Sequence, residues 1–273
     1  MTEKLLPQLE LPVITDKVKD KCQAASVLTR PGNTKLGKTP SHFSLPAVYT
    51  CPGRSATCAE GCYATKGHYR QPSVKDRYWV NHLLRLEDNF VDRICGQIAA
   101  DNVKLFRIHP SGDFDTPEYI EKWHQIISKR KTTDFWAYTR SWRVPELLPK
   151  LDLLSRLPNF QLWFSADKDT GQPPAIADVP VAYMASDDDD NPQWHADLVF
   201  RVKRKTKLLT QNQTLVCPAE RFDKFKRPNG KMSKQVTCDS CGLCFQAKRV
   251  KWLKEFNEMK RIAEEELSSE PTL

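Results

Sequence analysis

The sequence predicts an α/β protein in which parallel strands form a partial (β/α)6 barrel. Strand-like and helix-like segments alternate five or six times over residues 42–212, and such alternation is typical of βαβ units with a parallel sheet. The strands are apolar throughout, as in sheets buried on both faces. A doubly wound sheet shares this alternation. In either architecture ligands bind at the carboxyl ends of the strands.

Length and composition set the organisation of the chain. Its 273 residues are 40% hydrophobic and include seven tryptophans, which is enough for a packed core. The sequence has neither an apolar run approaching about 18 residues nor a secretory signal, so we expect a cytoplasmic protein. We predict an N-terminal extension over residues 1–41, the partial barrel over 42–212, and a cysteine-bearing segment with a charged helix over 213–273.

The predicted elements of the first half follow in order. A strand over residues 42–50 leads directly into a loop with three cysteines. A long helix is predicted over 74–100, with an apolar stripe of Leu83, Leu86, Phe90, Ile94 and Ile98. The next strand covers 103–109. A helix begins after it, with Thr116 as N-cap and Pro117 at the first helical position.

The second half repeats the pattern. A strand over residues 134–139 and a strand over 160–167 flank a helix over 144–157. Three weaker strands are predicted over 179–186, 197–202 and 213–217. The alternation then stops, and a helix over 246–267 ends the chain.

The nine cysteines indicate metal binding rather than disulfides. An odd count in a reducing compartment fits a disulfide framework poorly, and seven of the nine form two groups. The spacing of the first group is C-x6-C-x3-C, and that of the second is C-x2-C-x2-C with a distant Cys-Pro before it. The first group is Cys51, Cys58 and Cys62, and the second is Cys217, Cys238, Cys241 and Cys244.

The second group has the spacing of an iron–sulfur ligand run. Structural zinc prefers paired C-x2-C knuckles that are about a dozen residues or more apart. Three cysteines within residues 238–244 and one remote Cys-Pro are closer to the ligands of a [4Fe–4S] cluster. Zinc is the alternative.

The first group leaves one position of a metal site without a thiol. For zinc, the fourth ligand would be His68 or a water. For a [4Fe–4S] cluster, the open iron can take an external ligand. The loop begins where the first strand is predicted to end, at the mouth of the barrel, and a purely structural metal has no need to be there. The position therefore favours a cluster that binds a further ligand.

Polar residues follow the next three strands. After the second strand, Gly112 allows close backbone approach and Asp113 can receive an ammonium group. Side chains after the third and fourth strands point at the same mouth. The candidate cofactor-binding residues are Ser111, Gly112, Asp113, Thr139, Arg140, Ser165 and Asp167.

Together these features resemble a known superfamily. A cysteine triad after the first strand, a glycine–acid loop after the second and four cysteines after the barrel look like the radical S-adenosylmethionine enzymes. The stretches GNTKLGKTPSHFSLPAVYTCPG (32–53), CAEGCYATKGHYR (58–70) and TCDSCGLC (237–244) look still more like the phage gene product 88 family. This family resemblance spans about residues 32 to 245.

The resemblance implies two [4Fe–4S] clusters. The first would be held by the triad and chelated by the amino and carboxylate groups of S-adenosylmethionine, and the second by the four later cysteines. Asp113 would meet the methionyl ammonium, and Arg140 can pair with the carboxylate. The implied product is a 5′-deoxyadenosyl radical. A flavodoxin- or ferredoxin-type reductant is the implied electron donor, and the resemblance names no catalytic residue.

Charge suggests the class of substrate. The net charge is +8 with a pI near 9.0, and basic runs gather in the C-terminal third. We therefore expect an enzyme that acts on an anionic substrate, with a nucleotide or nucleic acid favoured. The alternative is a zinc- or iron–sulfur-stapled nucleic-acid-binding protein without catalysis. The sequence identifies neither the substrate nor the oligomeric state.

Overall fold

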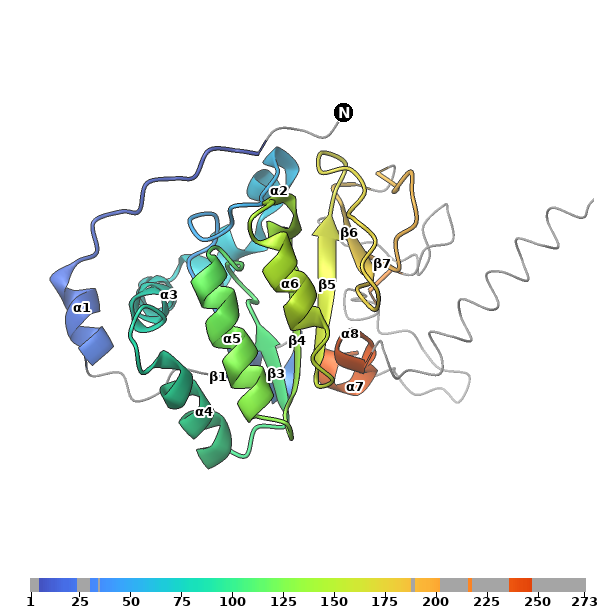
Figure 1. Ribbon diagram of the computed structural model, residues 1–273. Helices are drawn as coiled ribbons and strands as arrows, with labels where there is room; N and C mark the ends of the chain where they lie inside the picture. The colour runs from blue at the N-terminus through green and yellow to red at the C-terminus, as the bar shows by residue number, and fades with distance from the viewer. Residues whose placement is uncertain are drawn as a thin grey trace, which may run out of the picture.

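The computed structural model describes residues 5–23, 30–33, 35–187, 190–201, 216–217 and 236–246. Within these residues one seven-stranded sheet forms, with its strands in chain order (Figure 1). The strands are β1 (Arg30–Asn33), β2 (Gly37–Phe43), β3 (Leu105–Ile108), β4 (Asp134–Thr139), β5 (Phe160–Ala166), β6 (Val181–Ala185) and β7 (Leu198–Arg201).

The direction of the strands identifies the architecture. Strands β2 to β7 pair in parallel, and β1 pairs antiparallel with β2. A doubly wound sheet reverses its strand order at a switch point, whereas this order runs in one direction from end to end. The six parallel strands form a curled half-barrel. The α/β class and the parallel partial barrel predicted from the sequence are thus confirmed.

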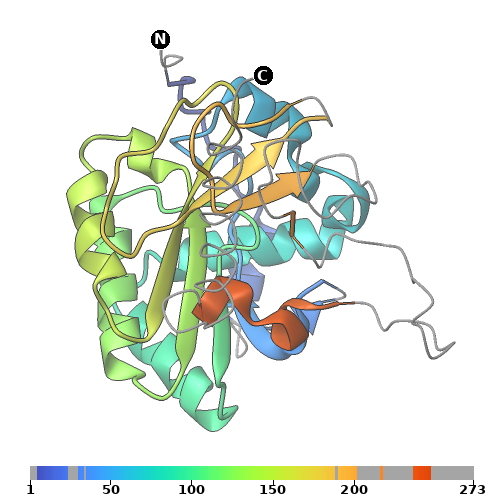
Figure 2. The same ribbon diagram turned by 90° about the vertical axis from the view of Figure 1, so that its right-hand side faces the viewer.

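The helices divide between the two faces of the sheet. Helices α3 to α6 cover one face, whereas α7 packs beside β2 and α8 beside β4 and β5 on the opposite, concave face (Figure 2). The α-helices are α1 (Asp16–Gln23), α2 (Ala56–Gly61), α3 (Pro72–Leu84), α4 (Phe90–Ala100), α5 (Pro117–Lys129), α6 (Leu148–Ser155), α7 (Cys238–Cys241) and α8 (Leu243–Gln246). Short 3-10 helices are η1 (Tyr63–Thr65), η2 (Gly67–Arg70) and η3 (Ser141–Arg143).

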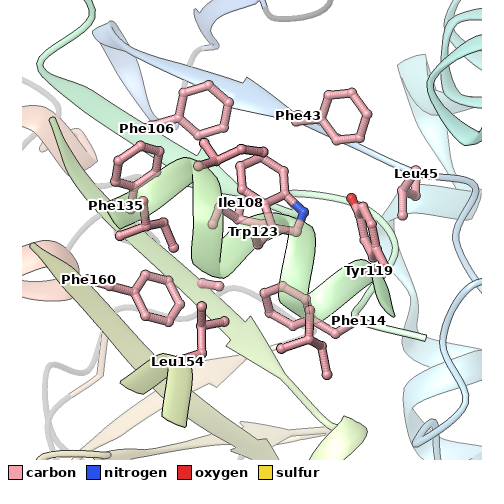
Figure 3. Close-up of a cluster of buried hydrophobic side chains, with 14 of the residues drawn as sticks. Phe43, Leu45, Phe106, Ile108, Phe114, Tyr119, Trp123, Phe135, Leu154 and Phe160 are labelled. Carbon is pink, nitrogen blue, oxygen red and sulfur yellow. The ribbon is translucent and has the colours of Figure 1, made fainter. Parts of the chain in front are cut away.

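The main core lies between the sheet and its covering helices. Trp123 of α5 packs against Phe43 and Phe106 with ring centroids 5.9 and 5.7 Å apart (Figure 3). Full burial of each such side chain contributes roughly 1.5–3 kcal/mol. Because side chains alternate along a strand, Phe106 and Ile108 face this core and Arg107 faces the concave side.

The single helix predicted over 74–100 is two helices, so that prediction was wrong. Helix α3 ends before Arg85 and α4 begins after the break. Lys122 Nζ of α5 donates to the carbonyl oxygens of Arg85 at 2.8 Å and Glu87 at 3.0 Å, which satisfies carbonyls freed at the break. Leu86, placed on the apolar stripe by its spacing, is 61% exposed.

The strand predicted over 42–50 ends at Phe43 instead. Beyond it the chain turns, because the Pro46 carbonyl accepts hydrogen bonds from the Thr50 amide at 3.2 Å and hydroxyl at 2.8 Å. Proline also removes one backbone donor that a strand would use. The cysteine loop therefore follows a tight turn rather than a strand.

Most other predicted elements are close to those observed. Strand 134–139 coincides with β4, and Thr116 caps α5 by accepting a hydrogen bond from the Tyr119 amide at 3.2 Å. The helix predicted over 144–157 is shorter in the structure, where α6 covers Leu148–Ser155. None of the described helices combines the length and apolar character needed to cross a bilayer.

Several predictions fall wholly or partly outside the described residues. Of the strand predicted over 213–217, only Val216 and Cys217 are described, and Val216 forms a parallel bridge with Val199. The basic runs after Arg201 and nearly all of the helix predicted over 246–267 lie outside the described residues. The three-part division of the chain stays a prediction.

Candidate metal and cofactor site

Two loops at the carboxyl ends of β2 and β3 are joined through their backbones. The Leu45 amide donates to the Ser111 carbonyl at 2.8 Å, and the Ser111 hydroxyl donates back to the Leu45 carbonyl at 2.8 Å. The Asp113 amide donates to the Thr50 carbonyl at 3.1 Å. The cysteine loop and the Ser-Gly-Asp loop are therefore one structural unit.

Two glycines allow this close packing. Gly112 has a φ of +84°, and a Cβ there would lie 2.5 Å from the Leu45 Cβ. A Cβ on Gly53 would lie 2.0 Å from the carbonyl oxygen of Arg140. Side chains larger than hydrogen do not fit at either position, so the cysteine loop lies directly on the chain that follows β4.

The three thiols of the first group lie within electrostatic reach of one another. Cys58 and Cys62 both raise the pKa of Cys51, after the larger effects of burial and of Asp113. Burial is also the main reason why the pKa values of Cys58 and Cys62 are raised. The Arg140 guanidinium opposes this rise at Cys58, because it lies beside that sulfur and stabilises the thiolate.

Helix α2 fixes the position of Cys58. Ser55 caps this helix by accepting a hydrogen bond from the Cys58 amide at 2.9 Å. The Ser55 hydroxyl in turn donates to Asp167 Oδ2 at 2.6 Å. A single serine thus connects the cysteine loop to the end of β5.

Asp113 makes its hydrogen bonds within the protein. Its Oδ1 accepts from the Thr139 hydroxyl at 2.6 Å and the Phe114 amide at 2.8 Å, and its Oδ2 accepts from the Arg140 amide at 2.8 Å. Burial raises the pKa of Asp113 to about 6, and these donors limit the rise. In this arrangement Asp113 and Thr139 fix the backbone after β4.

Arg140 and Asp167 form a buried ion pair at the mouth. The distance between Arg140 Nη2 and Asp167 Oδ2 is 3.0 Å, and their side chains are 8% and 0% exposed. Within the described residues, the buried Nε of Arg140 has no hydrogen-bond partner. Ser165 faces the concave side, and its carbonyl accepts a hydrogen bond from Trp142 Nε1 at 2.9 Å.

The second group of cysteines lies on the concave face. Cys217, Cys238, Cys241 and Cys244 pack in one cluster with Trp136 and Trp163. Trp163 Nε1 donates to the Cys244 carbonyl at 2.8 Å. Burial raises the pKa of Cys244, and Cys217 and Cys238 raise it further. The structure thus brings together all four thiols that the sequence grouped.

The two groups lie at opposite ends of the half-barrel. Helix α2 is at the carboxyl ends of the strands, and α7 is near their amino ends (Figure 1). Within the described ranges, no three histidine, cysteine, aspartate or glutamate side chains meet as ligands of one metal ion. His68, the zinc ligand considered from the sequence, is exposed, and its Nδ1 lies 3.3 Å from Gln71 Nε2.

Sequence reasoning missed several residues of this region. From the sequence alone, Ser55 could be recognised only as an N-cap of a helix. Arg107 interrupts an apolar strand, and the alternation of side chains could have placed it on the concave face. Its guanidinium lies 4.8 Å from the centre of the Tyr138 ring and near the thiols of Cys238 and Cys244.

Comparisons place the chain among phage proteins. The model of the family described as Gene product 88 matches residues 22–247. The Gene 88 protein of Mycobacterium phage L5 is 31% identical over 235 residues, which are 81% of this chain and 89% of that protein. The Gene 88 protein of Mycobacterium phage D29 is 30% identical over 236 residues, with the same two coverages. No solved structure matches the chain.

Proposed function

The chain belongs to the Gene product 88 family, and we propose that it is a radical S-adenosylmethionine enzyme with two [4Fe–4S] clusters. The observation that carries this proposal is the place of the cysteine triad. Cys51, Cys58 and Cys62 lie at the carboxyl ends of a parallel half-barrel, and Thr50, next to Cys51, accepts a hydrogen bond from the Asp113 amide of the Ser-Gly-Asp loop. Active sites of parallel barrels lie at that end, whereas a structural metal does not require it.

The triad fits a cluster better than a single ion. The thiols influence one another's pKa values, yet no described histidine or carboxylate completes a one-ion site with them. A four-iron cluster binds each thiolate through a different iron atom, so its ligand sulfurs stand farther apart than those of one ion. Three thiols then leave one iron for an external ligand.

The residues around the triad would bind and position the cofactor. Arg140, whose Nε has no hydrogen-bond partner among the described residues, would pair with the carboxylate of S-adenosylmethionine. Asp113 orders the chain that carries Arg140, and carbonyl oxygens of the Ser-Gly-Asp loop would accept hydrogen bonds from the ammonium group. Cys51, Cys58 and Cys62 would hold the cluster, which when bound and reduced would supply the electron for cleavage of the sulfonium. The protein positions the cofactor and excludes water.

The second cysteine group fits an electron-transfer or scaffolding cluster. Four thiols complete the ligands of four irons, so no iron remains open for substrate. Arg107 and the hydroxyl of Tyr138 lie beside Cys244. A guanidinium and a hydroxyl donor both stabilise thiolates. A flavodoxin- or ferredoxin-type protein is the class of donor that would reduce such a cluster.

The substrate that we propose is anionic, a nucleotide or a nucleic acid. A net charge of +8 favours such a partner. The rival function is a metal-stapled nucleic-acid-binding protein without catalysis, in which both cysteine groups hold structural metal.

An assay for cofactor cleavage tests the proposal. Anaerobically reconstituted protein should be brown and hold about eight irons per chain if two four-iron clusters form. Reduced with dithionite and given S-adenosylmethionine, it should release 5′-deoxyadenosine and methionine. Colourless protein that holds only zinc would contradict the proposal, and so would iron-loaded, reduced protein that leaves the cofactor intact.

A further inference from the structure

Tyr63 presents an aromatic ring to solvent beside the cysteine triad. It follows Cys62 directly and is 55% exposed. Its hydroxyl donates to the Pro110 carbonyl, so the polar end of the side chain is fixed at the end of β3. A ring that is held at one end and open on its face is prepared for stacking, since little side-chain entropy remains to be lost.

A second tyrosine supports this ring from the side. Tyr69 of η2 meets Tyr63 edge to face with centroids 5.5 Å apart, and Tyr78 of α3 continues the row at 6.3 Å from Tyr69. Tyr63 is the exposed member of this row, and Tyr69 and Tyr78 are half-buried. Aromatic rows of this kind are the platforms on which single-stranded nucleic acids stack their bases.

Positive charge surrounds the row. Residues 63–77 contain four lysines and arginines but only one acid, Asp76, and Asp76 is bonded to Lys21 of α1 at 2.5 Å. Lys66 and Arg70 are exposed, and within the described part of the chain neither forms an ion pair with a carboxylate. Their charges are therefore not neutralised by neighbouring acids.

A further cation lies on the inner side of the row. The Arg107 charge acts on both Tyr63 and Tyr69 and opposes the rise in their pKa values caused by burial of the hydroxyl groups. Arg107 stacks on Tyr138 and makes no ion pair with a described carboxylate. Its charge therefore adds to the positive potential on the inner side of the row.

We propose that the segment 63–70 binds a single-stranded nucleic acid, with one base stacked on Tyr63 and the backbone phosphates on Lys66 and Arg70. The inference rests on the proposed function, since it assigns the anionic substrate of that mouth to a defined surface. A single strand fits better than a duplex because the exposed face of Tyr63 can be covered only by an unpaired base. The stacked base would lie beside the triad.

Fluorescence anisotropy with a labelled single-stranded oligonucleotide of about 12 thymidines tests the stacking, a length within the site sizes known for such platforms. The iron-loaded protein is used without S-adenosylmethionine. Tyr63→Leu should weaken binding about tenfold, whereas Tyr63→Trp should bind within about threefold of the wild type because it keeps a stacking ring. The matched control is Leu153→Ala, since Leu153 of α6 is similarly exposed at 52% and lies away from the mouth.

The dependence of binding on salt tests the phosphate contacts. Lys66→Gln and Arg70→Gln should each lower the slope of log Kd against log salt by about 0.7, the value for one phosphate contact on a single strand. Lys129→Gln should leave the slope unchanged, because Lys129 of α5 is exposed on the opposite, helical face. The Lys66 and Arg70 variants test the inference even if Tyr63→Leu fails to fold, since both of these side chains are exposed.

The outcomes separate this inference from the proposed function. Equal affinity of wild type and Tyr63→Leu, no binding of the oligonucleotide, or tighter binding of the matched duplex would each overturn the inference. Cofactor cleavage without oligonucleotide binding would support the enzyme proposal and contradict the proposed nucleic-acid surface. Oligonucleotide binding that depends on Tyr63, without cofactor cleavage, would support the surface and contradict the enzyme.

Discussion

At the scale of single residues, burial and charge act against each other around the triad. Burial raises the pKa values of Cys51, Cys58 and Cys62, which disfavours the thiolates that a metal needs. The positive charge of Arg140 opposes the rise in the pKa of Cys58, because it stabilises the thiolate. Metal binding would supply the remaining stabilisation and release protons as it does so, so loading of the triad should weaken as the pH falls.

Replacement of one triad cysteine tests whether the two groups are independent. Cys62→Ala should lower the iron content from about eight to about four atoms per chain and abolish cofactor cleavage, while the second cluster remains. Iron and sulfide analysis with EPR spectroscopy measures this. Cys95→Ala is the control, since Cys95 lies on α4 outside both groups. Loss of all iron from Cys62→Ala would show that the two groups depend on each other.

His82 should make stability sensitive to acid. Burial and Arg85 lower its pKa from 6.5 to about 4, although Asp115 opposes the shift. Since the folded-state pKa is the lower one, the unfolded chain binds more protons in this window, and stability falls as the pH drops from about 6.5 towards 4. From pH 7 to pH 5 the free energy of unfolding should decrease by about 2 kcal/mol more in the wild type than in His82→Gln.

Urea unfolding followed by tryptophan fluorescence at the two pH values checks this difference. Carboxylates shared by the two proteins cancel in the comparison. An identical pH dependence of wild type and His82→Gln would mean that His82 does not titrate below its usual range.

At the scale of elements, backbone contacts made through two glycines place the site. The cysteine loop contacts the chain after β4 at Gly53, and the Ser-Gly-Asp loop contacts Leu45 at Gly112. These contacts depend on the absence of a Cβ and hardly at all on side-chain chemistry. The pattern of polar residues at the strand ends predicted that the loops meet, but it gave no information on how closely.

Substitution of Gly53 should therefore destabilise the whole mouth. The Cβ of Gly53→Ala would overlap the Arg140 carbonyl, and such overpacking costs about 1–3 kcal/mol. Gly96→Ala is the matched control, because Gly96 lies in α4 with open space where a Cβ would stand; it should raise stability by up to about 1 kcal/mol. Urea unfolding measures both, and a neutral Gly53→Ala would contradict the close approach.

Local signals explain which elements could be predicted. Apolar runs located β4 and β5, and a serine- or threonine-type cap with proline located α5. The break between α3 and α4 could not be predicted from local sequence. It depends on Lys122 of α5, which donates hydrogen bonds to the carbonyl groups at the break. The end of β2 was likewise set by a turn around Pro46 that an apolar pattern conceals.

At the scale of the whole molecule, strand order determines how the site residues meet. Parallel strands in sequential order bring the ends of β2, β3, β4 and β5 to one edge. The residues predicted at those ends do gather there, and Arg140 and Asp167 pair across β4 and β5. The sequence could not predict the hydrogen bonds and ion pairs that these residues form with one another. Asp113, expected to face a ligand, accepts hydrogen bonds from its own protein, and Arg107 lies near Cys238 and Cys244 of the second group on the concave face.

The claim that the triad holds a cluster with one open iron has a direct spectroscopic test. Reduced protein is mixed with S-adenosylmethionine that carries ¹⁵N in its amino group, and the cluster's EPR and ENDOR spectra are recorded. The account predicts a change in the EPR signal and a ¹⁵N coupling to the cluster, both absent in Cys62→Ala. An EPR signal that is unchanged by the cofactor, with no ¹⁵N coupling in a fully iron-loaded sample, would contradict it.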